Sequence, residues 1–384
     1  MSPGLARPGQ RRLVHGMGKT LVAADWPPLT DEDVSAVLGG GTSGAVVTWH
    51  SPRPWSAAGL VSWRGARVFV KRHHVSVRTV GQLAAEHAFA RHLRDRGVPV
   101  PAVLRLANGT TATRRGDFVY EAHQLAAGTD LYRDAVSWTP FAGPGHARAA
   151  GEALARLHLA AAGFAAPEHP PAVLTGGCAV TVAADPLGRL SQLVASRPDL
   201  ACYLAGRPWR DDARAHLLPA LERAGPLCRR LPRQWGHGDW HPSNLTWTGS
   251  GPDARVAGVL DLGLANRTFA VHDLATAIER SAVAWLDLAE TGHASVDAAG
   301  LDALLDGYAS VRPLPAAEAA ALAEVLPVVH LEFALSEVEY FAAVTGSAAN
   351  AELAYDDYLI GHARWFAGPD GSAVLDHLRR RARR

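Results

Sequence analysis

The fold of this chain is decided by His237-Gly238-Asp239-Trp240-His241-Pro242-Ser243-Asn244, a stretch followed seventeen residues later by Asp261-Leu262-Gly263. Each of these residues would suit a turn, because glycine frees the backbone and short polar side chains bond to nearby amides. Turn chemistry does not account for the spacing of an Asp, an Asn five residues later and a second Asp before a glycine. That spacing predicts phosphoryl transfer from a metal-bound nucleotide, in which one carboxylate orients a hydroxyl group and the other two side chains hold the metal.

The sequence around this stretch fits the same chemistry. Residues 245–248 and 256–260 are short apolar runs, and the segment 249–253 between them has the composition of a hairpin loop. Such a hairpin would carry Asn244 in at one end and Asp261 out at the other. Protein kinases use His-Arg-Asp-x-x-x-x-Asn followed by Asp-Phe-Gly, and the motifs of this chain stand in the same order.

The composition limits the class of protein. The chain has 384 residues, of which 48% are hydrophobic, and a formal net charge of +1. This length suits one large domain or two lobes, and the charge predicts no general attraction to nucleic acid or to an anionic membrane. We see no signal peptide or membrane span in the hydrophobic pattern. Three cysteines without metal-binding spacing favour a reducing cytoplasm, and a monomer or homodimer is expected.

Lysine is rare enough in this chain to be informative, because Lys19 and Lys71 are the only two. Lys19 follows a segment that looks like the end of a phosphate loop, but that pattern needs glycine where this chain has Leu13. Lys71 instead ends an apolar run that predicts a strand. A compact ammonium group in that place can bind the α- and β-phosphates of a nucleotide.

The first part of the chain predicts a flexible segment at 1–28 and a nucleotide-binding lobe at 29–123. Thr30 is expected to cap a short helix with Asp33 as its reciprocal acid. A helix at 80–96 carries Glu86, a candidate partner for Lys71. The strand-like runs of this lobe are 45–50, 59–63, 67–71, 103–106 and 118–122.

Two further features of the nucleotide site are predicted. The hinge that offers backbone groups to the base is expected at residues 121–124, with Glu121 and His123 as candidate nucleotide-binding residues. The loop 51–56 or the glycine-rich stretch 39–44 would cover the phosphates, although a helix stop explains the second equally well. The rest of the chain, 124–384, is expected to be mainly helical; its predicted helices include 187–205 and 211–231.

Together these motifs resemble the aminoglycoside phosphotransferase and choline kinase-like superfamily of small-molecule kinases. The resemblance covers about residues 45–345, and the segment 69–128 looks closest to the branch of type II homoserine kinases and a bacterial stress-response kinase. It rests on Val68-Phe69-Val70-Lys71, Glu86-His87, Gly151-x-x-Leu154-Ala155-Arg156-Leu157-His158, His237 to Asn244, Asp261-Leu262-Gly263 and Val271-His272-Asp273-Leu274-Ala275.

The resemblance implies an α+β, bilobal, protein-kinase-like fold, with a small five-stranded antiparallel N-terminal lobe that has one helix and a larger, mainly helical C-terminal lobe. ATP or GTP and Mg²⁺ are the implied cofactors. Asp239 is implied as the catalytic base or hydroxyl-orienting group, and Asn244 and Asp261 as the metal ligands. Lys71 and Glu86 would place the phosphates, and His237 and Asp273 would be structural residues beside the catalytic loop.

The acceptor is expected between Asp239 and the last helices. His241 could touch substrate or metal, although a loop histidine is more often a hydrogen-bonded strut. Glu332 and Glu339 share one face of a mixed helix, which would suit an amine-bearing acceptor, and a solvated face explains the same pattern.

Three functions remain open on the sequence. The first is an ATP- or GTP-dependent phosphotransferase acting on a hydroxyl of a small polar molecule, such as an aminoglycoside or nucleoside antibiotic, an amino alcohol or a homoserine-like metabolite. The second is a protein Ser/Thr kinase of the stress-response type, which the short segment between Asp261 and His272 disfavours. The third is a catalytically inactive nucleotide-binding module, against which the intact motifs argue.

Overall fold

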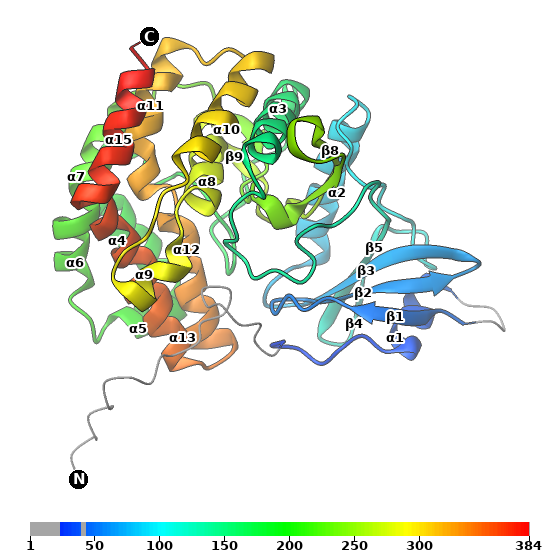
Figure 1. Cartoon of the computed structure of the whole chain (residues 1–384). Coiled ribbons are helices and arrows are strands. Elements are labelled where there is room, and N and C mark those ends of the chain that lie inside the picture. Colours follow the sequence, from blue (N-terminus) through cyan, green and yellow to red (C-terminus); the bar gives the residue numbers. More distant parts are fainter. Residues whose placement is uncertain (1–23, 40–43, 384) are drawn as a thin grey trace.

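A computed structural model describes residues 24–39 and 44–383, which form two lobes (Figure 1). The small lobe holds an antiparallel sheet of five strands in the order β1-β2-β3-β5-β4. The predicted α+β fold with a five-stranded antiparallel small lobe is confirmed. The strands are β1 (Val46–His50), β2 (Ala57–Trp63), β3 (Ala66–His74), β4 (Ala112–Arg115) and β5 (Phe118–Gln124).

The prediction of a strand at 103–106 is wrong. In that segment Val103 forms only an isolated bridge with His123, and the strand at this edge of the sheet is β4, which pairs with β5 across a short turn. The Leu104 amide donates to the Ala122 carbonyl of β5 at 2.8 Å, but the Leu106 amide donates to the Thr110 carbonyl at 2.7 Å, so the pairing with β5 does not continue along this segment.

Two helices of the small lobe begin at capping boxes. α1 (Asp31–Leu38) follows Thr30, whose Oγ1 accepts a hydrogen bond from the Asp33 amide at 3.1 Å, while the Asp33 carboxylate accepts one from the Thr30 amide at 3.1 Å. The predicted cap is therefore confirmed. α2 (Val80–Arg94) begins after Thr79 in the same way and turns its apolar face to the core.

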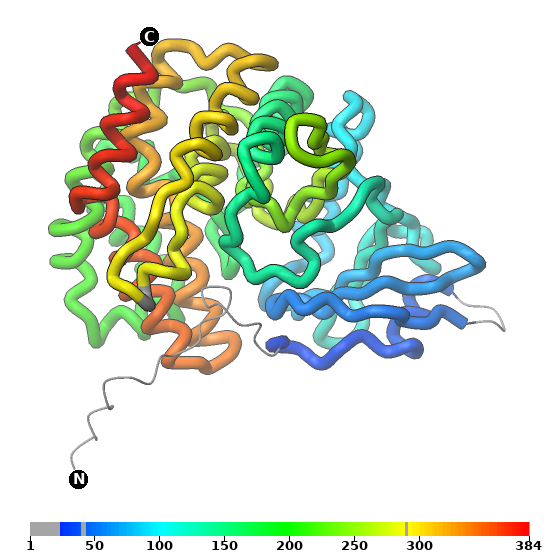
Figure 2. Tube along the Cα trace, viewed as in Figure 1, coloured from blue at the N-terminus to red at the C-terminus, as the bar shows by residue number. Residues whose placement is uncertain are grey.

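A short segment near the N-terminus bridges the lobes. The Trp26 ring stacks on the His74 ring of the small lobe with centroids 4.4 Å apart, and the Tyr340 hydroxyl of the large lobe donates to the Asp25 carboxylate at 2.6 Å. In Figure 2 this blue segment begins beside the orange helices of the large lobe. Of the segment predicted to be flexible, residues 1–23 and with them Lys19 lie outside the described residues.

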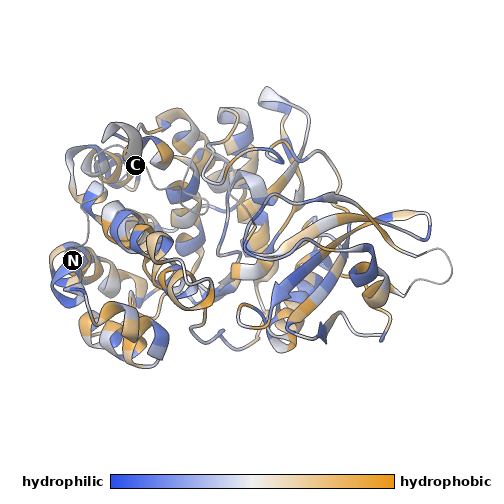
Figure 3. Ribbon diagram, turned by 90° about the horizontal axis from the view of Figure 1, so that it is seen from below, coloured by the Kyte–Doolittle hydropathy of each residue, from blue (hydrophilic) through white to orange (hydrophobic). Residues whose placement is uncertain are grey.

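The large lobe is mainly helical, and its helices carry both hydrophobic and hydrophilic residues, as the hydropathy colouring of Figure 3 shows. An apolar face on each helix is what a shared core requires. The α-helices are α3 (Pro144–Ala161), α4 (Pro186–Ala195), α5 (Pro198–Leu204), α6 (Trp209–Asp212), α7 (Leu218–Cys228), α8 (Ala270–Ser281), α9 (Trp285–Thr291), α10 (Ala298–Val311), α11 (Ala316–Val325), α12 (Leu331–Glu339), α13 (Ala348–Leu353), α14 (His362–Ala367) and α15 (Pro369–Arg381).

Two predicted helices are divided in the structure. The segment 187–205 contains α4 and α5, because Pro198 starts a new helix and the residue before it, Arg197, is not helical (φ −126°, ψ 88°). The segment 211–231 passes from α6 through a π-helical stretch, Ala213–Leu217, into α7.

The predicted hairpin after the catalytic loop is confirmed. β7 (Leu245–Thr248) pairs with β8 (Arg255–Val259), and a 3₁₀ turn at Gly251–Asp253 joins them. β6 (Gln234–Gly236) pairs with β9 (Asn266–Thr268) beside this hairpin. The two short sheets therefore hold the catalytic loop and the Asp261 segment next to each other.

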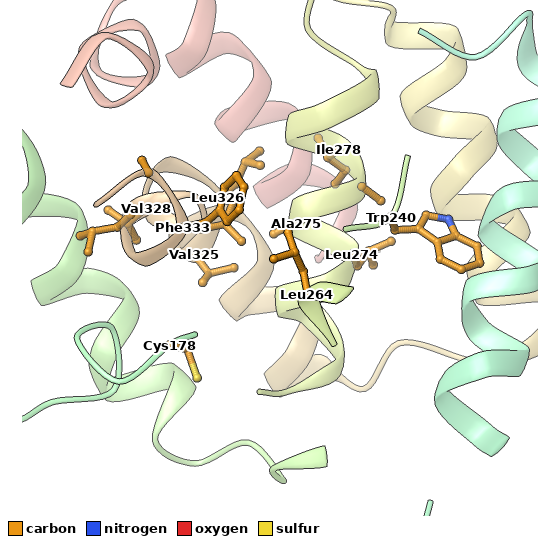
Figure 4. Packing of buried hydrophobic residues seen from close by; sticks show 14 of the residues in the cluster. Cys178, Trp240, Leu264, Leu274, Ala275, Ile278, Val325, Leu326, Val328 and Phe333 are labelled. Atoms are coloured by element: carbon orange, nitrogen blue, oxygen red, sulfur yellow. The ribbon is translucent and has the colours of Figure 1, made fainter. Parts of the chain in front are cut away.

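The core of the large lobe surrounds α8. In Figure 4, Trp240 of the catalytic loop lies on one side of this helix, and Val325 and Leu326 lie on the other. Trp240, Leu274 and Leu326 are fully buried. The helix that carries Asp273 is thus packed on all sides, which fixes its position relative to the catalytic loop.

The α3 and α10 helices cross with their backbones in contact at two glycines. A Cβ atom on Gly151 would lie 2.0 Å from the carbonyl oxygen of Leu304, and one on Gly307 would lie 2.1 Å from that of Arg148. Only glycine permits such an approach.

The stretch Ala316–Val344 is long and apolar enough to cross a membrane by length and composition. However, 83% of its most apolar window is buried inside the protein. This is how the central helices of a packed lobe look, so the stretch is assigned to the core.

Candidate active site

The catalytic loop begins where β6 ends, and its shape depends on Gly238. This residue has φ +76°, and a Cβ atom on it would lie 2.1 Å from the carbonyl oxygen of Leu264. The loop therefore requires glycine between His237 and Asp239. The imidazole of His237 is fully buried and bonds to the Leu260 carbonyl at 2.9 Å, which ties the loop to the strand that leads into Asp261.

Asp273 fixes the start of the catalytic loop through hydrogen bonds to its backbone. Its buried carboxylate accepts hydrogen bonds from the amides of His237 at 2.5 Å and Gly238 at 2.7 Å. The His158 ring lies 3.1 Å from the same carboxylate and 2.8 Å from the Tyr308 hydroxyl. Burial alone would raise the pKa of Asp273, but these hydrogen bonds outweigh burial and lower it.

Asp239 faces the cleft and pairs with an arginine that the sequence analysis missed. One carboxylate oxygen lies 2.7 Å from the Arg280 guanidinium, and the other accepts a hydrogen bond from Asn244 at 3.0 Å. Burial would raise the pKa of Asp239, but Arg280 and then His241, 3.5 Å away, hold it well below its usual range. A signal for Arg280 existed, since it follows Asp273 by seven residues and therefore lies on the same face of α8.

Asn244 and Asp261 offer the oxygen ligands predicted for a metal. The Asn244 amide nitrogen donates to the Asp239 carbonyl and carboxylate, both at 3.0 Å, so its Oδ1 is the atom left to bind a cation. The side chain of Asp261 is 44% exposed to the cleft, and its Oδ1 accepts a hydrogen bond from the Gly263 amide at 3.3 Å. A carboxylate and an amide oxygen fit Mg²⁺, which prefers hard oxygen ligands.

Lys71 and Glu86 are both at the cleft, but they are not paired with each other. The Lys71 Nζ lies 2.9 Å from the Asp261 carboxylate, whereas Glu86 pairs with Arg78 at 3.2 Å. The expected Lys71–Glu86 ion pair is therefore replaced by two others. Arg78 lies two residues before α2 and also donates to the Gly263 carbonyl at 2.6 Å, so its pair with Glu86 links α2 to the Asp261 segment.

The side chain of Glu121, a predicted nucleotide-binding residue, is committed elsewhere. Its buried carboxylate is within hydrogen-bond distance of three histidine rings, His73 at 3.0 Å, His87 at 2.7 Å and His123 at 2.9 Å. Burial would raise the pKa of Glu121, but these histidines hold it well below the usual value. Glu121 is therefore a structural centre of the small lobe, and its side chain has no free oxygen for a nucleotide.

The predicted hinge backbone is also partly occupied. The Ala122 carbonyl accepts from the Leu104 amide, and the Gln124 amide donates to the Ala102 carbonyl, both at 2.8 Å. Leu125 and Ala126, which follow β5, also line the cleft.

The loop 51–56, one of the two stretches predicted to cover the phosphates, lines the cleft. Arg53 from this loop donates to Ser137 at 3.2 Å and to the Tyr132 carbonyl at 3.3 Å, across from the small lobe. The Trp55 ring lies 6.0 Å from the Phe333 ring of α12. The glycine-rich alternative falls mostly in residues 40–43, which lie outside the described residues.

The cleft has a volume of about 600 Å³ and extends past Asp239 into a pocket with aromatic walls. The Arg280 guanidinium lies 5.0 Å from the ring centres of both Trp138 and Phe333. Glu337 also lines this pocket, is 3% exposed, and has one carboxylate oxygen without a hydrogen-bond partner.

Glu332 and Glu339, the predicted acceptor-binding residues, do not line the cleft. Glu332 faces a different hollow, and Glu339 pairs with Arg197 beside α5. The sequence pattern identified an acidic face of α12 correctly but not the direction in which it points. The face toward Asp239 carries Phe333 and Glu337 instead.

Glu337 makes stability depend on pH in a predictable direction. Burial raises the pKa of Glu337 from 4.5 to about 8. A carboxyl group shifted in this direction stabilises the fold fully below about pH 4.5, and that contribution is lost as the pH rises to about 8. We expect Glu337→Gln to raise Tm at pH 9 by about 2 °C or more, and to leave it nearly unchanged at pH 5, as measured by scanning fluorimetry. The exposed Glu222→Gln is the control, and equal Tm values for Glu337→Gln and wild type at pH 9 would contradict the shift.

Together, the bilobal fold and a cleft lined by Lys71, Asp239, Asn244 and Asp261 define the class of kinase-like phosphotransferases. Residues 53–314 match the model of the phosphotransferase enzyme family, and the chain belongs to this family. The resemblance predicted from the motifs is confirmed.

Individual relatives agree with this assignment. The chain is 26% identical to a homoserine kinase of Methylobacillus flagellatus over 71% of its own length and 74% of that protein. It is 29% identical to an uncharacterized protein of Deinococcus radiodurans over 67% of its own length and 66% of that protein.

Two solved structures share the fold. An aminoglycoside phosphotransferase from Alicyclobacillus acidocaldarius has a TM-score of 0.54 at 18% identity, covering 93% of this chain and 98% of that one. The amicoumacin kinase hAmiN, solved with AMP-PNP and Ca²⁺, has a TM-score of 0.55 at 12% identity, covering 86% and 93%.

Proposed function

We propose that this protein transfers the γ-phosphoryl group of ATP or GTP to a hydroxyl group of a small, amine-bearing polar molecule. The observation that carries the proposal is that Asp239 lies between the two ends of one cleft. On one side lie Lys71, Asn244 and Asp261, and on the other lies the aromatic pocket with the unpaired carboxylate oxygen of Glu337.

The nucleotide end supports the transfer step. Asn244 and Asp261 would hold Mg²⁺, which when bound neutralises charge on the β- and γ-phosphates. The Lys71 ammonium group would bind the phosphates, and the Arg53 guanidinium group of the loop 51–56 would add a second positive charge to the cleft. Asp239 would orient the acceptor hydroxyl in line with the γ-phosphorus. It would take the hydroxyl proton as the new O–P bond forms and the bond from the γ-phosphorus to the β–γ bridging oxygen breaks, which releases ADP or GDP.

The acceptor end supports the choice of substrate class. One oxygen of the buried Glu337 carboxyl group has no hydrogen-bond partner, which is costly. An ammonium group on the acceptor would satisfy this oxygen and favour the ionised form of Glu337. The volume of about 600 Å³ for the whole cleft, nucleotide site included, favours a small acceptor. A protein substrate is disfavoured because only Leu264–Phe269 separates Gly263 from α8, which leaves no room for a long activation segment.

The test is a screen for ADP or GDP release with purified protein and Mg²⁺. The acceptors are amino alcohols, homoserine and other hydroxy amino acids, aminoglycosides, sugars and nucleosides, each amine paired with an analogue that lacks the amino group. We expect turnover with an amine-bearing acceptor, and we expect Glu337→Gln to raise its KM by about tenfold or more while leaving the KM for ATP unchanged. Preference for the analogues without an amine would contradict the substrate class, and no turnover with any acceptor would contradict the transferase function.

A further inference from the structure

A second hollow of about 400 Å³ lies in the large lobe and shares no lining residue with the active-site cleft. Its walls come from the irregular chain around Gly176 and Gly177, from α4 and from the start of α12. A separate small hollow of about 10 Å³ borders both of them, sharing Asn266 with the second hollow and Gly263 with the cleft. A ligand in the hollow would therefore bind separately from one in the cleft.

Three arginines converge on this hollow, namely Arg189, Arg197 and Arg233. Arg197 is 6% exposed and pairs with Glu339, and Arg233 pairs with Glu168 at 2.9 Å. Arg189 forms no ion pair with any carboxylate in the described part of the chain. The Arg233 Nε is buried without a hydrogen-bond partner. The hollow thus presents guanidinium groups whose hydrogen-bonding capacity is not used within the protein.

Glu332 forms one wall of the hollow and offsets part of this charge when it is ionised. It is 7% exposed, and its Oε1 accepts a hydrogen bond from the Val180 amide at 2.7 Å. Burial raises the pKa of Glu332 to about 7. Near neutral pH the carboxyl group is therefore partly protonated, and in that form it can donate a hydrogen bond to an anion.

The close approach of the chain to Glu332 gives the wall its shape. A Cβ atom on Gly177 would lie 2.5 Å from the Glu332 carboxylate, so the backbone passes directly beside it. Asn266 holds the same segment by accepting from the His169 amide at 2.8 Å and donating to the Gly176 carbonyl at 2.9 Å. The hollow is consequently built from fixed groups on several elements, as binding pockets are.

We propose that this hollow is a second binding site for a small anionic metabolite, whose carboxylate or phosphate group is held by Arg189, Arg197 and Arg233. Guanidinium groups bind both kinds of anion through paired N–H donors. Its size suits a molecule larger than the anion alone, because ligand pockets of 300–1,000 Å³ hold metabolite-sized ligands. Glu332, which the acceptor site does not use, lines this second site.

The experiment is isothermal titration calorimetry of the full chain with inorganic phosphate or with succinate, at constant ionic strength. Saturating Mg·AMP-PNP occupies the phosphate-binding end of the cleft. We expect at least one of the two anions to bind with Kd of about 1 mM or tighter, and which one binds decides between phosphate and carboxylate ligands. Arg189→Gln should weaken binding about tenfold or more. Arg230→Gln, an exposed arginine in the same lobe, is the matched control and should leave Kd unchanged.

Three outcomes would overturn the proposal. The first is the absence of binding by either anion at about 10 mM. The second is binding that disappears when Mg·AMP-PNP is added, which would place the anion in the cleft. The third is an equal effect of Arg189→Gln and Arg230→Gln. Because half-buried Arg189 forms no ion pair in the described part of the chain, its replacement should keep the fold, and an unchanged Tm in Arg189→Gln verifies this.

Discussion

Replacement of Asp239 by asparagine is expected to reduce kcat by about 10²–10⁴-fold, the usual contribution of a general acid or base. The amide can still accept the hydrogen bond from Asn244, so the loop keeps its shape. It cannot take the proton of the acceptor hydroxyl, and it leaves Arg280 without its carboxylate partner. The measurement is the initial rate of ADP release with the acceptor found in the screen.

The control for Asp239→Asn is Asp253→Asn, because Asp253 is exposed in the loop at the far end of the β7–β8 hairpin. The control variant should turn over like wild type. The KM for Mg·ATP in Asp239→Asn should stay within about threefold of wild type, since the other cleft residues hold the nucleotide. A variant that kept more than a tenth of wild-type kcat would remove Asp239 from the catalytic role.

Replacement of Asp261 by alanine is expected to lower kcat/KM for the nucleotide by about 10²–10³-fold, by analogy with the loss of one group that stabilises developing charge. The change removes one of the two oxygen ligands proposed for the metal and the carboxylate that pairs with Lys71. Binding of AMP-PNP should then lose most of its dependence on Mg²⁺. Titration calorimetry with and without Mg²⁺ measures this directly and needs no acceptor.

The fold of Asp261→Ala should be unaffected, because the side chain is 44% exposed and its hydrogen bond to the Gly263 amide is long at 3.3 Å. A Tm close to that of wild type and of Asp253→Ala would verify this. Equal gains in AMP-PNP affinity on adding Mg²⁺ to Asp261→Ala and wild type would show that the metal is held by other residues.

The parts of this protein that could be predicted from sequence are those set by short-range spacing. The catalytic loop, the hairpin after it and the Thr30 cap each depend on residues within about twenty positions of one another. The partners of Lys71 and Glu86 could not be predicted in the same way. They depend on where Arg78 and Asp261 lie in space, and a motif spacing carries no information on that.

The acceptor pocket illustrates the same limit on a single helix. The periodicity of α12 places Glu332 and Glu339 on one face and Glu337 on another, but periodicity alone does not say which face meets Asp239. Packing decides it, because Phe333 is drawn against Trp55 and Arg280. The three histidines around Glu121 were equally hidden, since β3, α2 and β5 bring them together from distant parts of the sequence.

The glycine contact between α3 and α10 extends the constraints of catalysis to residues that no substrate meets. His158 on α3 and Tyr308 on α10 share a hydrogen bond. His158 also bonds to Asp273, which in turn binds the Gly238 amide beside Asp239, so the position of α3 affects the catalytic loop. A single methyl group at Gly151 would push the two helices apart far from the reacting atoms. The two glycines are therefore expected to be required for turnover as well as for folding. A substitution there should lower catalytic activity in the same way as a substitution in the active site.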